Sequence, residues 1–468
     1  MKNKKFYLTT SIAYTNAPPH LGYALEAVQA DVLARRRRIL GEDVFFLTGT
    51  DEHGRKVAEA AQKSGKSPED FTEEISEKFR ALTRVLNLSN DDFIRTTDEK
   101  RHWPEVKKVW LELKNKGDIY KKPYRGLYCV GCEAFITKKD LLDGKCRIHQ
   151  KEPEVIEEEN YFFRLSKYSK EIKDILAKNK IKIIPATRKN EMMSFAKEGL
   201  EDVSFSRPRK DLRWGIPVPD DETQTIYVWA DALVNYLSGA PGRWPADIHC
   251  VGKDIFKFHS LIWPGMLLSL GLPLPKAILV HGFITVAGQK MSKSLGNVIN
   301  PFELVEKYGV DPVRYFLLRE IPPTEDGDYT QQKFEERYNA DLAKGLGNLL
   351  ARVIKMAQIS NFQFPISNKF SNHNFQKIIG QTRKEHNRCL DEFRFNEALM
   401  AIWELIGFCD KYIEKEKPWL GGKDNVISDL LSVISSIAEM LRPFLPETSE
   451  NILKQLQTLK SQPLFPRI

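Results

Sequence analysis

The pattern that most restricts the fold of this chain is an alternation of strand-like and helix-like segments that stops and later resumes. Residues 6–12 (FYLTTSI) and 43–50 (DVFFLTGT) read as strands, the second a continuous apolar run typical of a buried parallel strand, and Leu25, Val28, Val32 and Leu33 mark one helical face between them. The alternation returns in residues 225–237, 247–267 and 276–286. Strands that alternate with helices predict βαβ units and a doubly wound parallel sheet.

Two further segments differ in composition from this sheet. From about residue 115 to residue 213, short β-like pieces lie among glycines, cysteines and charged residues, and beyond residue 331 the pattern is almost entirely helical. We therefore expect an α/β fold, a split Rossmann-like sheet, with residues 1–114 as its first half and 214–330 as its second. Residues 115–213 form an inserted domain and residues 331–468 an all-α helical bundle in this prediction.

Length and composition agree with a chain of several domains. The 468 residues are 42% hydrophobic and 29% charged, and the net charge of +8 permits a polyanionic partner such as nucleic acid, although a merely basic surface would look the same. The N-terminus lacks the features of a signal peptide, and the apolar residues 260–280 are interrupted by prolines and glycines. We expect a cytoplasmic protein with no membrane span.

The first chemical feature lies in residues 17–32 (APPHLGYALEAVQADV). A helix expected to begin near Leu21 would present free backbone N–H groups and the positive end of its dipole to an anion. Gly22 would let a phosphate or nucleoside approach the backbone, and His20 could donate a hydrogen bond to a phosphate oxygen. On its own this is a weak indication, because a loop histidine is more often a plain surface residue.

The second chemical feature is residues 287–297 (AGQKMSKSLGN), which follow the last predicted strand. Lys290 and Lys293, with small polar neighbours, form a cationic loop suited to a polyphosphate whose charge shifts during reaction. A solvated basic turn is the alternative. The five-residue string KMSKS (residues 290–294), which follows a strand in the second half of the same sheet, favours the functional interpretation.

Together the two motifs resemble the class I aminoacyl-tRNA synthetases. The stretches 6–22, 45–54, 214–219, 227–236, 252–264 and 281–297 resemble the methionyl-tRNA synthetase family in particular. About 270 residues separate His20 from Lys290, which leaves no room for the large editing insertion of the branched-aliphatic enzymes. The cysteinyl enzymes hold a zinc ion beside the first motif, whereas this chain has no cysteine before Cys129. The resemblance implies activation of L-methionine by ATP, with magnesium, and transfer to the terminal adenosine of tRNA(Met), initiator tRNA included.

The resemblance also implies site residues. Those expected to bind ATP are His20, Gly22, Tyr23, Gly252, Asp254, Lys290, Met291, Ser292, Lys293 and Ser294, of which His20, Gly22, Tyr23, Lys290 and Lys293 carry the catalysis. Those expected to line the methionine pocket are Ser11, Ile12, Tyr14, Asp51, Trp229, Ala232, Leu233, Tyr236, Ile255 and His259. Aromatic rings suit a thioether, and the Asp51 carboxylate could pair with the substrate ammonium. Taken singly, Trp229 and Tyr236 would be read as ordinary core residues.

A cysteine cluster marks the inserted segment. Cys129 and Cys132 form one x2-spaced pair, and Cys146 and His149 form another after thirteen intervening residues. Three thiolates and an imidazole suit tetrahedral zinc, and four protein ligands leave no open position, so we expect one structural zinc in a knuckle. Many relatives have cysteine where this chain has His149. Free cysteines beside a surface histidine are the alternative.

The C-terminal helices resemble the family's anticodon-binding bundle. Asn348 and Arg352 share a helical face, and Trp419 follows Pro418 amid lysines, as a stacking platform for an anticodon base would. A hydrophobic contact between helices is the alternative for Trp419. Because the chain ends soon after this bundle, we expect a monomer.

Two other function classes remain open from the sequence. A non-catalytic RNA-binding paralogue is favoured by Tyr23, which stands where the family pattern has a second histidine, but the intact KMSKS string argues against it. A small-molecule nucleotidyltransferase would share the His-x-Gly turn, yet would leave the KMSKS loop, the cysteine cluster and the helical bundle unexplained.

Overall fold

In the computed structural model the described residues are 4–132, 134–136, 140–148, 150–291, 296–360, 373–466 and 468. The chain divides into two compact units. The sheet unit comprises Met1–Pro19, Arg37–Arg84 and Ser89–His281. The helical unit comprises His20–Arg36, Val85–Leu88 and Gly282–Ile468. Within the described residues, no helix has both the length and the apolar character that a membrane span requires.

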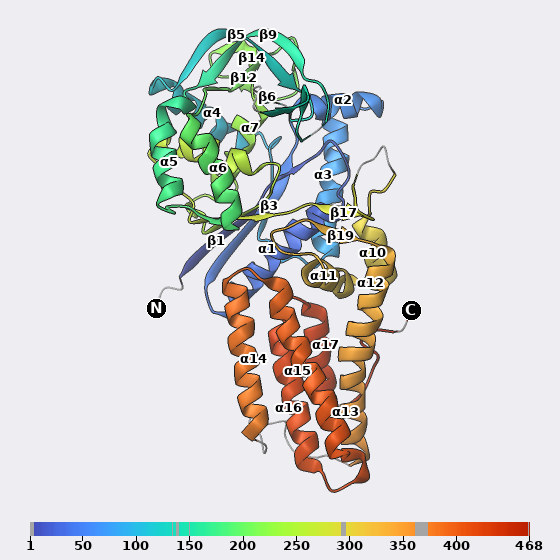
Figure 1. The fold of residues 1–468 in the computed structure, drawn as a ribbon. Helices are drawn as coiled ribbons and strands as arrows, with labels where there is room; N and C mark the ends of the chain where they lie inside the picture. The colour runs from blue at the N-terminus through green and yellow to red at the C-terminus, as the bar shows by residue number, and fades with distance from the viewer. Residues whose placement is uncertain are drawn as a thin grey trace. The chain divides into compact units, whose positions relative to one another are not determined.

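The sheet unit is built on a seven-stranded parallel sheet (Figure 1). The strand order is β10 (Lys182–Ile184), β16 (Ala277–His281), β15 (Ile248–Gly252), β1 (Lys5–Thr10), β3 (Asp43–Asp51) and β2 (Ala13–Tyr14), with β4 (Asp92–Arg95) also paired to β3. Strand β1 pairs in parallel with β15 on one side and with β3 on the other. Two distant parts of the sequence thus share one sheet, which confirms the predicted split α/β fold class.

The buried strands explain the apolar runs in the sequence. Strands β15 and β16 are buried at every residue, and β3 is buried over its last six residues, as expected where helices cover a parallel sheet. Helices α4 (His102–Asn115) and α9 (Trp263–Leu270) contribute Trp110 and Met266 to one hydrophobic core with Val251 of β15 and Val280 of β16. The sheet unit also contains α2 (Arg55–Lys63) and most of α3 (Pro68–Val85).

The segment after α4 forms smaller antiparallel sheets. The longest pairing joins β5 (Ile119–Cys129) to β9 (Glu154–Phe163), with β6 (Ala134–Ile136) and β11 (Val203–Ser204) at the edges (Figure 1). Strands β12 (Ser206–Pro208), β14 (Asp221–Ile226) and β13 (Pro217–Val218) form another sheet, and β7 (Leu141–Leu142) pairs with β8 (Lys145–Cys146). Helices α5 (Ser169–Ala177) and α6 (Ala186–Glu198) flank β10, which lies within residues 115–213 and yet pairs with β16 at the edge of the main sheet.

The helical unit begins with α1 (Leu21–Ile39), of which Leu21–Arg36 belong to this unit. A small sheet follows, formed by β17 (Ile284–Val286), β18 (Gln289–Lys290) and β19 (Gly327–Tyr329). The remaining helices are α10 (Pro301–Tyr308), α11 (Val310–Arg319), α12 (Gln331–Arg337), the π-helix η5 (Tyr338–Gly347), α13 (Asn348–Ile359), α14 (His373–Asp391), α15 (Phe395–Glu416), η6 (Pro418–Leu420), α16 (Asp424–Leu441) and α17 (Pro446–Thr458). Helices α13 to α17 lie side by side, as Figure 1 shows, in the predicted C-terminal bundle.

Candidate active site

The residues predicted to line a methionine pocket all lie in the sheet unit, on four stretches of chain. Ser11, Ile12 and Tyr14 follow β1, and Asp51 ends β3. Trp229, Ala232, Leu233 and Tyr236 lie on or beside α7 (Val228–Ala232) and α8 (Asn235–Ser238), and Ile255 and His259 follow β15. Residues beyond the carboxyl ends of parallel strands are where open α/β sheets bind ligands.

The structure brings several of these residues into direct contact. The Ser11 N–H donates to the Cys250 carbonyl at 2.9 Å, which joins the ends of β1 and β15. Tyr14 pairs with Asp51 in the β2–β3 register, and the Asp51 carbonyl accepts from the Thr15 N–H. Asp51 is 5% exposed, so its carboxylate lies at a largely buried strand end.

Tyr236 and His259 form the best-defined polar contact among the predicted lining residues. His259 lies in the π-helix η3 (Phe258–Ile262), a type of element common at functional sites. Its Nδ1 lies 3.1 Å from the Ile255 carbonyl and must donate, so a neutral ring leaves Nε2 to accept from the Tyr236 hydroxyl at 2.6 Å. Burial lowers the pKa of His259 to about 4, so the ring is neutral at pH 7.

An aromatic contact that the sequence analysis did not include lies beside this pair. The ring of Trp229 stacks on that of Phe258, with centroids 3.7 Å apart and planes at 7°. Phe258 directly precedes His259 within the stretch that carries the family resemblance, and its aromatic character could have marked it as a candidate. The outer face of a ring in such a stack is an apolar surface of the kind that suits a thioether side chain.

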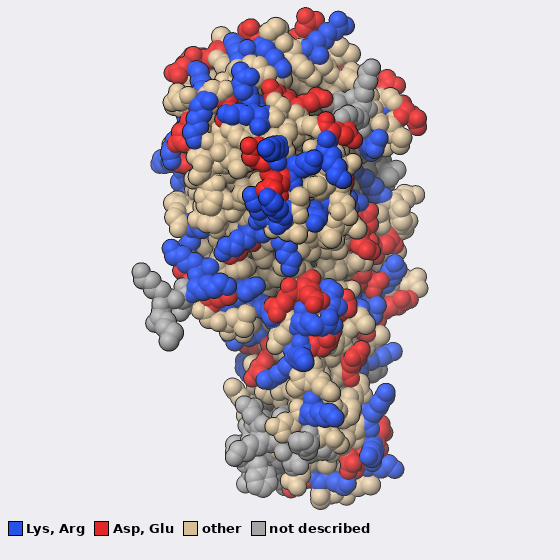
Figure 2. Space-filling model, turned by 60° about the vertical axis from the view of Figure 1, so that its left-hand side comes forward, with Lys and Arg blue, Asp and Glu red and all other residues tan. Residues whose placement is uncertain are grey.

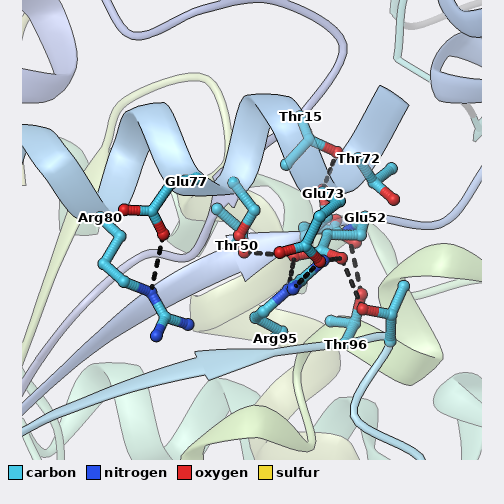
Figure 3. Close-up of polar contacts among 12 residues, drawn as sticks. Thr15, Thr50, Glu52, Thr72, Glu73, Glu77, Arg80, Arg95 and Thr96 are labelled. Carbon is cyan, nitrogen blue, oxygen red and sulfur yellow. Dashed lines mark hydrogen bonds and ion pairs between the residues drawn. The ribbon is translucent and has the colours of Figure 1, made fainter. Parts of the chain in front are cut away.

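A buried ionic cluster holds the segment that follows Asp51 (Figure 3). Glu52 is fully buried, and its two carboxylate oxygens accept from Arg95 Nε at 2.7 Å and Arg95 Nη2 at 2.9 Å. Thr50 and Thr97 donate to the same carboxylate at 2.6 and 2.5 Å, and the Glu52 N–H donates to Thr96 Oγ1. Because the buried charge is paired and its oxygens are hydrogen-bonded, this cluster fixes the end of β3 against the end of β4.

Gly252 and Asp254, predicted to contact ATP, lie at the carboxyl end of β15 in the same unit. A Cβ at position 252 would lie 2.8 Å from Asp254 Oδ1 and 3.6 Å from His281 Nε2. The Gly252 backbone is buried while Asp254 is exposed. A side chain at position 252 would therefore displace the Asp254 carboxylate, which is predicted to bind ATP.

His20, Gly22 and Tyr23 lie in the helical unit at the beginning of α1, where the sequence predicted the helix to start. The Gly22 N–H donates to His20 Nδ1 at 3.0 Å, so the hydrogen of a neutral ring sits on Nε2. A Cβ on Gly22 would lie 2.9 Å from His20 Cε1. The exposed His20 is thus oriented by the backbone of its own turn, and its Nε2–H can donate to an anion.

Lys290 ends the β17–β18 hairpin, whose turn uses Ala287 and Gly288 at positive φ. Lys290 is exposed, its Nζ lies 5.1 Å from the centroid of the Phe283 ring, and its carbonyl accepts from Asn297. Met291 is described and partly buried. Ser292, Lys293 and Ser294 of the predicted ATP set lie outside the described residues.

The three cysteines of the predicted zinc knuckle meet in the sheet unit. The Sγ atoms of Cys129, Cys132 and Cys146 lie within 4.8 Å of one another, and Cys132 and Cys146 are 3.6 Å apart. Zn–S bonds of about 2.3 Å in a tetrahedron place sulfurs about 3.8 Å apart, so the donors fit zinc. Burial raises the pKa of the Cys129 and Cys132 thiols and so disfavours the thiolates that zinc binds. A bound cation offsets this cost because it stabilises the thiolates. His149 lies outside the described residues.

The residues predicted to contact an anticodon lie in the helical unit. Asn348 and Arg352 occupy the first turns of α13, and Arg352 pairs with Glu414 at 2.6 Å and Asp410 at 3.6 Å on α15. Trp419 lies in η6 after Lys417, which has a left-handed backbone. Trp419 is 45% exposed and is followed by the still more exposed Leu420. The indole face of Trp419 is therefore accessible.

Comparisons with known proteins identify the family. The sequence matches the family described as tRNA synthetases class I (M) over residues 6–140 and 136–354. The methionine–tRNA ligase of Thermotoga maritima is 42% identical over 97% of this chain and 75% of its own length. That of Brucella suis is also 42% identical, over 97% of this chain and 92% of its own length. This chain belongs to the methionine–tRNA ligase family of class I synthetases.

Other comparisons agree with this family membership. Residues 373–466 match the anticodon-binding domain of tRNA ligase. Mycobacterium tuberculosis methionyl-tRNA synthetase in complex with methionyl-adenylate is 37% identical, with a TM-score of 0.91 over 99% of this chain and 98% of that one. Its apo form gives a TM-score of 0.84 at 33% identity, over 100% of this chain and 98% of that one. The family resemblance predicted from the sequence is confirmed.

Proposed function

We propose that this chain is an ATP-dependent methionine–tRNA ligase. The carboxylate oxygen of L-methionine attacks the α-phosphorus of ATP, the bond from the α-phosphorus to the bridging oxygen of the β,γ-phosphates breaks, and pyrophosphate leaves as methionyl-adenylate forms. A ribose hydroxyl of the terminal adenosine of tRNA(Met) then attacks the activated carbonyl, and AMP leaves. The observation that carries the proposal is that residues named by the family resemblance are paired across separate stretches of the sheet unit, Tyr236 with His259 by a hydrogen bond and Tyr14 with Asp51 in strand register.

In this proposal the methionine side chain lies against apolar and aromatic groups of the sheet unit. The Trp229–Phe258 stack supplies an aromatic surface for sulfur, and the neutral His259–Tyr236 pair supplies a polar edge without a formal charge. The Asp51 carboxylate binds the substrate ammonium, because a largely buried strand end strengthens that attraction. Ser11, Ile12, Tyr14, Ala232, Leu233 and Ile255 complete the proposed wall.

His20 and the backbone of Gly22 hold phosphate oxygens in this mechanism, and Asp254 holds the ribose. Lys290 and Lys293 neutralise the departing pyrophosphate. Tyr23, Met291, Ser292 and Ser294 belong to the same proposed ATP site. Magnesium bound to ATP supplies further charge neutralisation. The chemistry needs position and charge stabilisation rather than a nucleophilic side chain.

One structural zinc is proposed for Cys129, Cys132, Cys146 and His149. The tRNA partner, initiator tRNA included, is proposed to contact Asn348, Arg352 and Trp419 on the helical unit. Lys and Arg side chains are abundant on the face seen in Figure 2, with acidic side chains among them, which agrees with a polyanionic partner. The four-part domain division, a monomeric state and a cytoplasmic location stay predictions.

Two assays on the full chain test this function. ATP–pyrophosphate exchange should depend on L-methionine and on none of the other protein amino acids at equal concentration. The same preparation should attach methionine to tRNA(Met). Exchange with a different amino acid, or no exchange with any, would contradict the proposal.

A further inference from the structure

A buried carboxylate links two histidines next to the proposed methionine pocket. Asp231 lies on α7, between Trp229 and Ala232 in sequence, and is fully buried. Its Oδ2 lies 2.6 Å from His53 Nδ1, and its Oδ1 lies 2.7 Å from His102 Nε2. None of the proposed steps in the ligase reaction uses this cluster.

The protonation of the cluster follows from its contacts. Burial alone would raise the pKa of Asp231, but the attraction of His53 and the hydrogen bonds from both imidazoles hold this pKa below its ordinary value. An ionised carboxylate only accepts hydrogen bonds, so His53 Nδ1 and His102 Nε2 both donate. The remaining nitrogen of His102 lies 2.7 Å from Ser238 Oγ.

The two histidines and Ser238, which contacts His102, lie on three different segments of the sheet unit. His53 follows Asp51 by two residues, His102 begins α4, and Ser238 ends α8, which carries Tyr236. Helix α7 has only five residues, far fewer than a helix needs to be stable on its own. Its orientation therefore depends on contacts outside the helix, and Asp231 provides charge-assisted hydrogen bonds, about twice as strong as neutral ones.

We propose that Asp231 is a positioning residue for methionine binding. Its paired hydrogen bonds to His53 and His102 fix the orientation of α7 and so set the place of Trp229, Ala232 and Leu233 relative to Asp51. This inference rests on the proposed function, because it assigns those residues to the methionine site. The proposed ATP residues Gly252 and Asp254 lie on a different segment, at the carboxyl end of β15.

The test is Asp231→Asn in the full chain, with steady-state exchange kinetics against methionine and ATP separately. An asparagine keeps the volume but loses the charge, and its amide nitrogen cannot accept from one of the imidazoles. We expect the KM for methionine to rise by about tenfold or more, since small displacements of positioning groups have large effects, while the KM for ATP changes by less than about twofold. Equal changes in both constants, or no change in either, would overturn the proposal.

Asp118→Asn is the matched control. Asp118 is also buried in the sheet unit and accepts from Lys167, Tyr168 and Ser269, none of which lies on α7 or α8. The Asp118→Asn variant should have a lower melting temperature than the wild type but an unchanged KM for methionine. A comparable rise in that KM for Asp118→Asn would show that any loss of a buried carboxylate is enough, and would overturn a specific role for Asp231.

The histidine side of the contact supplies a second test if Asp231→Asn does not fold. His53→Ala should raise the KM for methionine, and His53→Asn should restore it, because an asparagine amide can replace the Nδ1–H donor. Equal effects of alanine and asparagine would count against the positioning role. A wild-type chain with no methionine-dependent exchange would instead contradict the proposed function itself.

Discussion

Arg314 Nη2 lies 2.8 Å from Asp31 Oδ2 in the helical unit, and both side chains are fully buried. Arg314 on α11 also donates to the backbone carbonyls of Leu86, Pro443 and Phe444. Asp31 lies on α1, the helix that begins with the His-Leu-Gly-Tyr turn, and accepts from Arg35 as well. One guanidinium thus joins α1, α11 and the turn between α16 and α17.

Loss of one partner of this pair should destabilise the helical unit strongly. Arg314→Met removes a buried cationic partner of the Asp31 carboxylate and the donor to three backbone carbonyls, so the free energy of unfolding should fall by about 3–5 kcal/mol. The combination Asp31→Asn with Arg314→Met should cost less than the sum of the two single changes. Denaturant unfolding of the four proteins checks this, and strict additivity would contradict a direct coupling.

Much of the fold follows from local patterns in the sequence. The continuous apolar run at residues 43–50 predicted a buried strand, and β3 is buried over its last six residues, as expected for a strand of a parallel sheet that helices cover. The start of α1 at Leu21 was also predictable from the loop that precedes it. The pairing of β10 with β16 was not, because a three-residue strand within the inserted segment carries no signal of a partner almost a hundred residues away.

The residues of the candidate site could be predicted only from the family resemblance. Periodicity alone would assign Trp229 and Tyr236 to a hydrophobic core, and Tyr236 is in fact 1% exposed. The Asp231–His53 contact spans 178 positions in the chain, so no local pattern indicates it. Contacts of this kind depend on tertiary packing, which places an acidic residue in an apolar helix beside histidines from elsewhere.

The lowered pKa values of three buried histidines predict how the stability of the folded chain changes with pH. Burial lowers the pKa of His259 and His386 from 6.5 to about 4 and that of His249 well below its usual value. Between about pH 4 and 6.5 the unfolded chain therefore binds more protons than the folded one, and the stability should fall as the pH falls through this window. Each shift from 6.5 to about 4 corresponds to on the order of 3 kcal/mol.

Melting temperatures measured from pH 7.5 to 4.5, in steps of about one pH unit, check this prediction. Asp221 and Glu385 have pKa values lowered to about 2, so their stabilising effect is lost mainly below this range. His386→Gln, remote from the proposed pocket residues in sequence, should flatten the slope. An unchanged slope in that variant would contradict the assignment to His386.

Zinc should copurify at about one ion per chain, because three sulfurs and an imidazole close a tetrahedral site. Cys146→Ser removes a buried ligand and should destabilise the inserted segment more than it changes methionine binding, since the cluster packs with Ile136 rather than with the predicted pocket residues. Metal analysis of protein purified without chelator, with thermal unfolding of the variant, tests both statements. A chain free of metal and unaffected by Cys146→Ser would contradict them.

Trp419→Ala should depress tRNA aminoacylation and spare adenylate formation. Stacking of one base on an exposed indole is typically worth roughly 1–3 kcal/mol, which corresponds to an increase of about fivefold or more in the KM for tRNA. Leu420→Ala, at a neighbouring and even more exposed position, is the matched control and should change the KM for tRNA less. Equal losses in pyrophosphate exchange and aminoacylation would make Trp419 a structural residue instead.

Tyr23 is the residue at which this chain departs from the family's His-x-Gly-His pattern. Its backbone N–H donates to the His20 carbonyl at 3.1 Å, so the turn itself forms with tyrosine in place. A tyrosine offers a hydroxyl donor and a broad face but no proton equilibrium near neutral pH. If the second histidine acted as an acid or base, tyrosine would abolish activity, whereas if it only donates a hydrogen bond or packs on the nucleotide, tyrosine can replace it.

The proposed reaction favours replacement, because the attacking carboxylate is already ionised and no side chain needs to take a proton. We therefore expect an active wild type in which Tyr23→His changes the exchange rate by less than about tenfold, or roughly 1.4 kcal/mol. His20→Ala, which removes a preorganised donor from the same turn, should reduce the rate by on the order of a hundredfold. An inert wild type that Tyr23→His makes active would contradict the prediction and would favour a non-catalytic tRNA-binding paralogue.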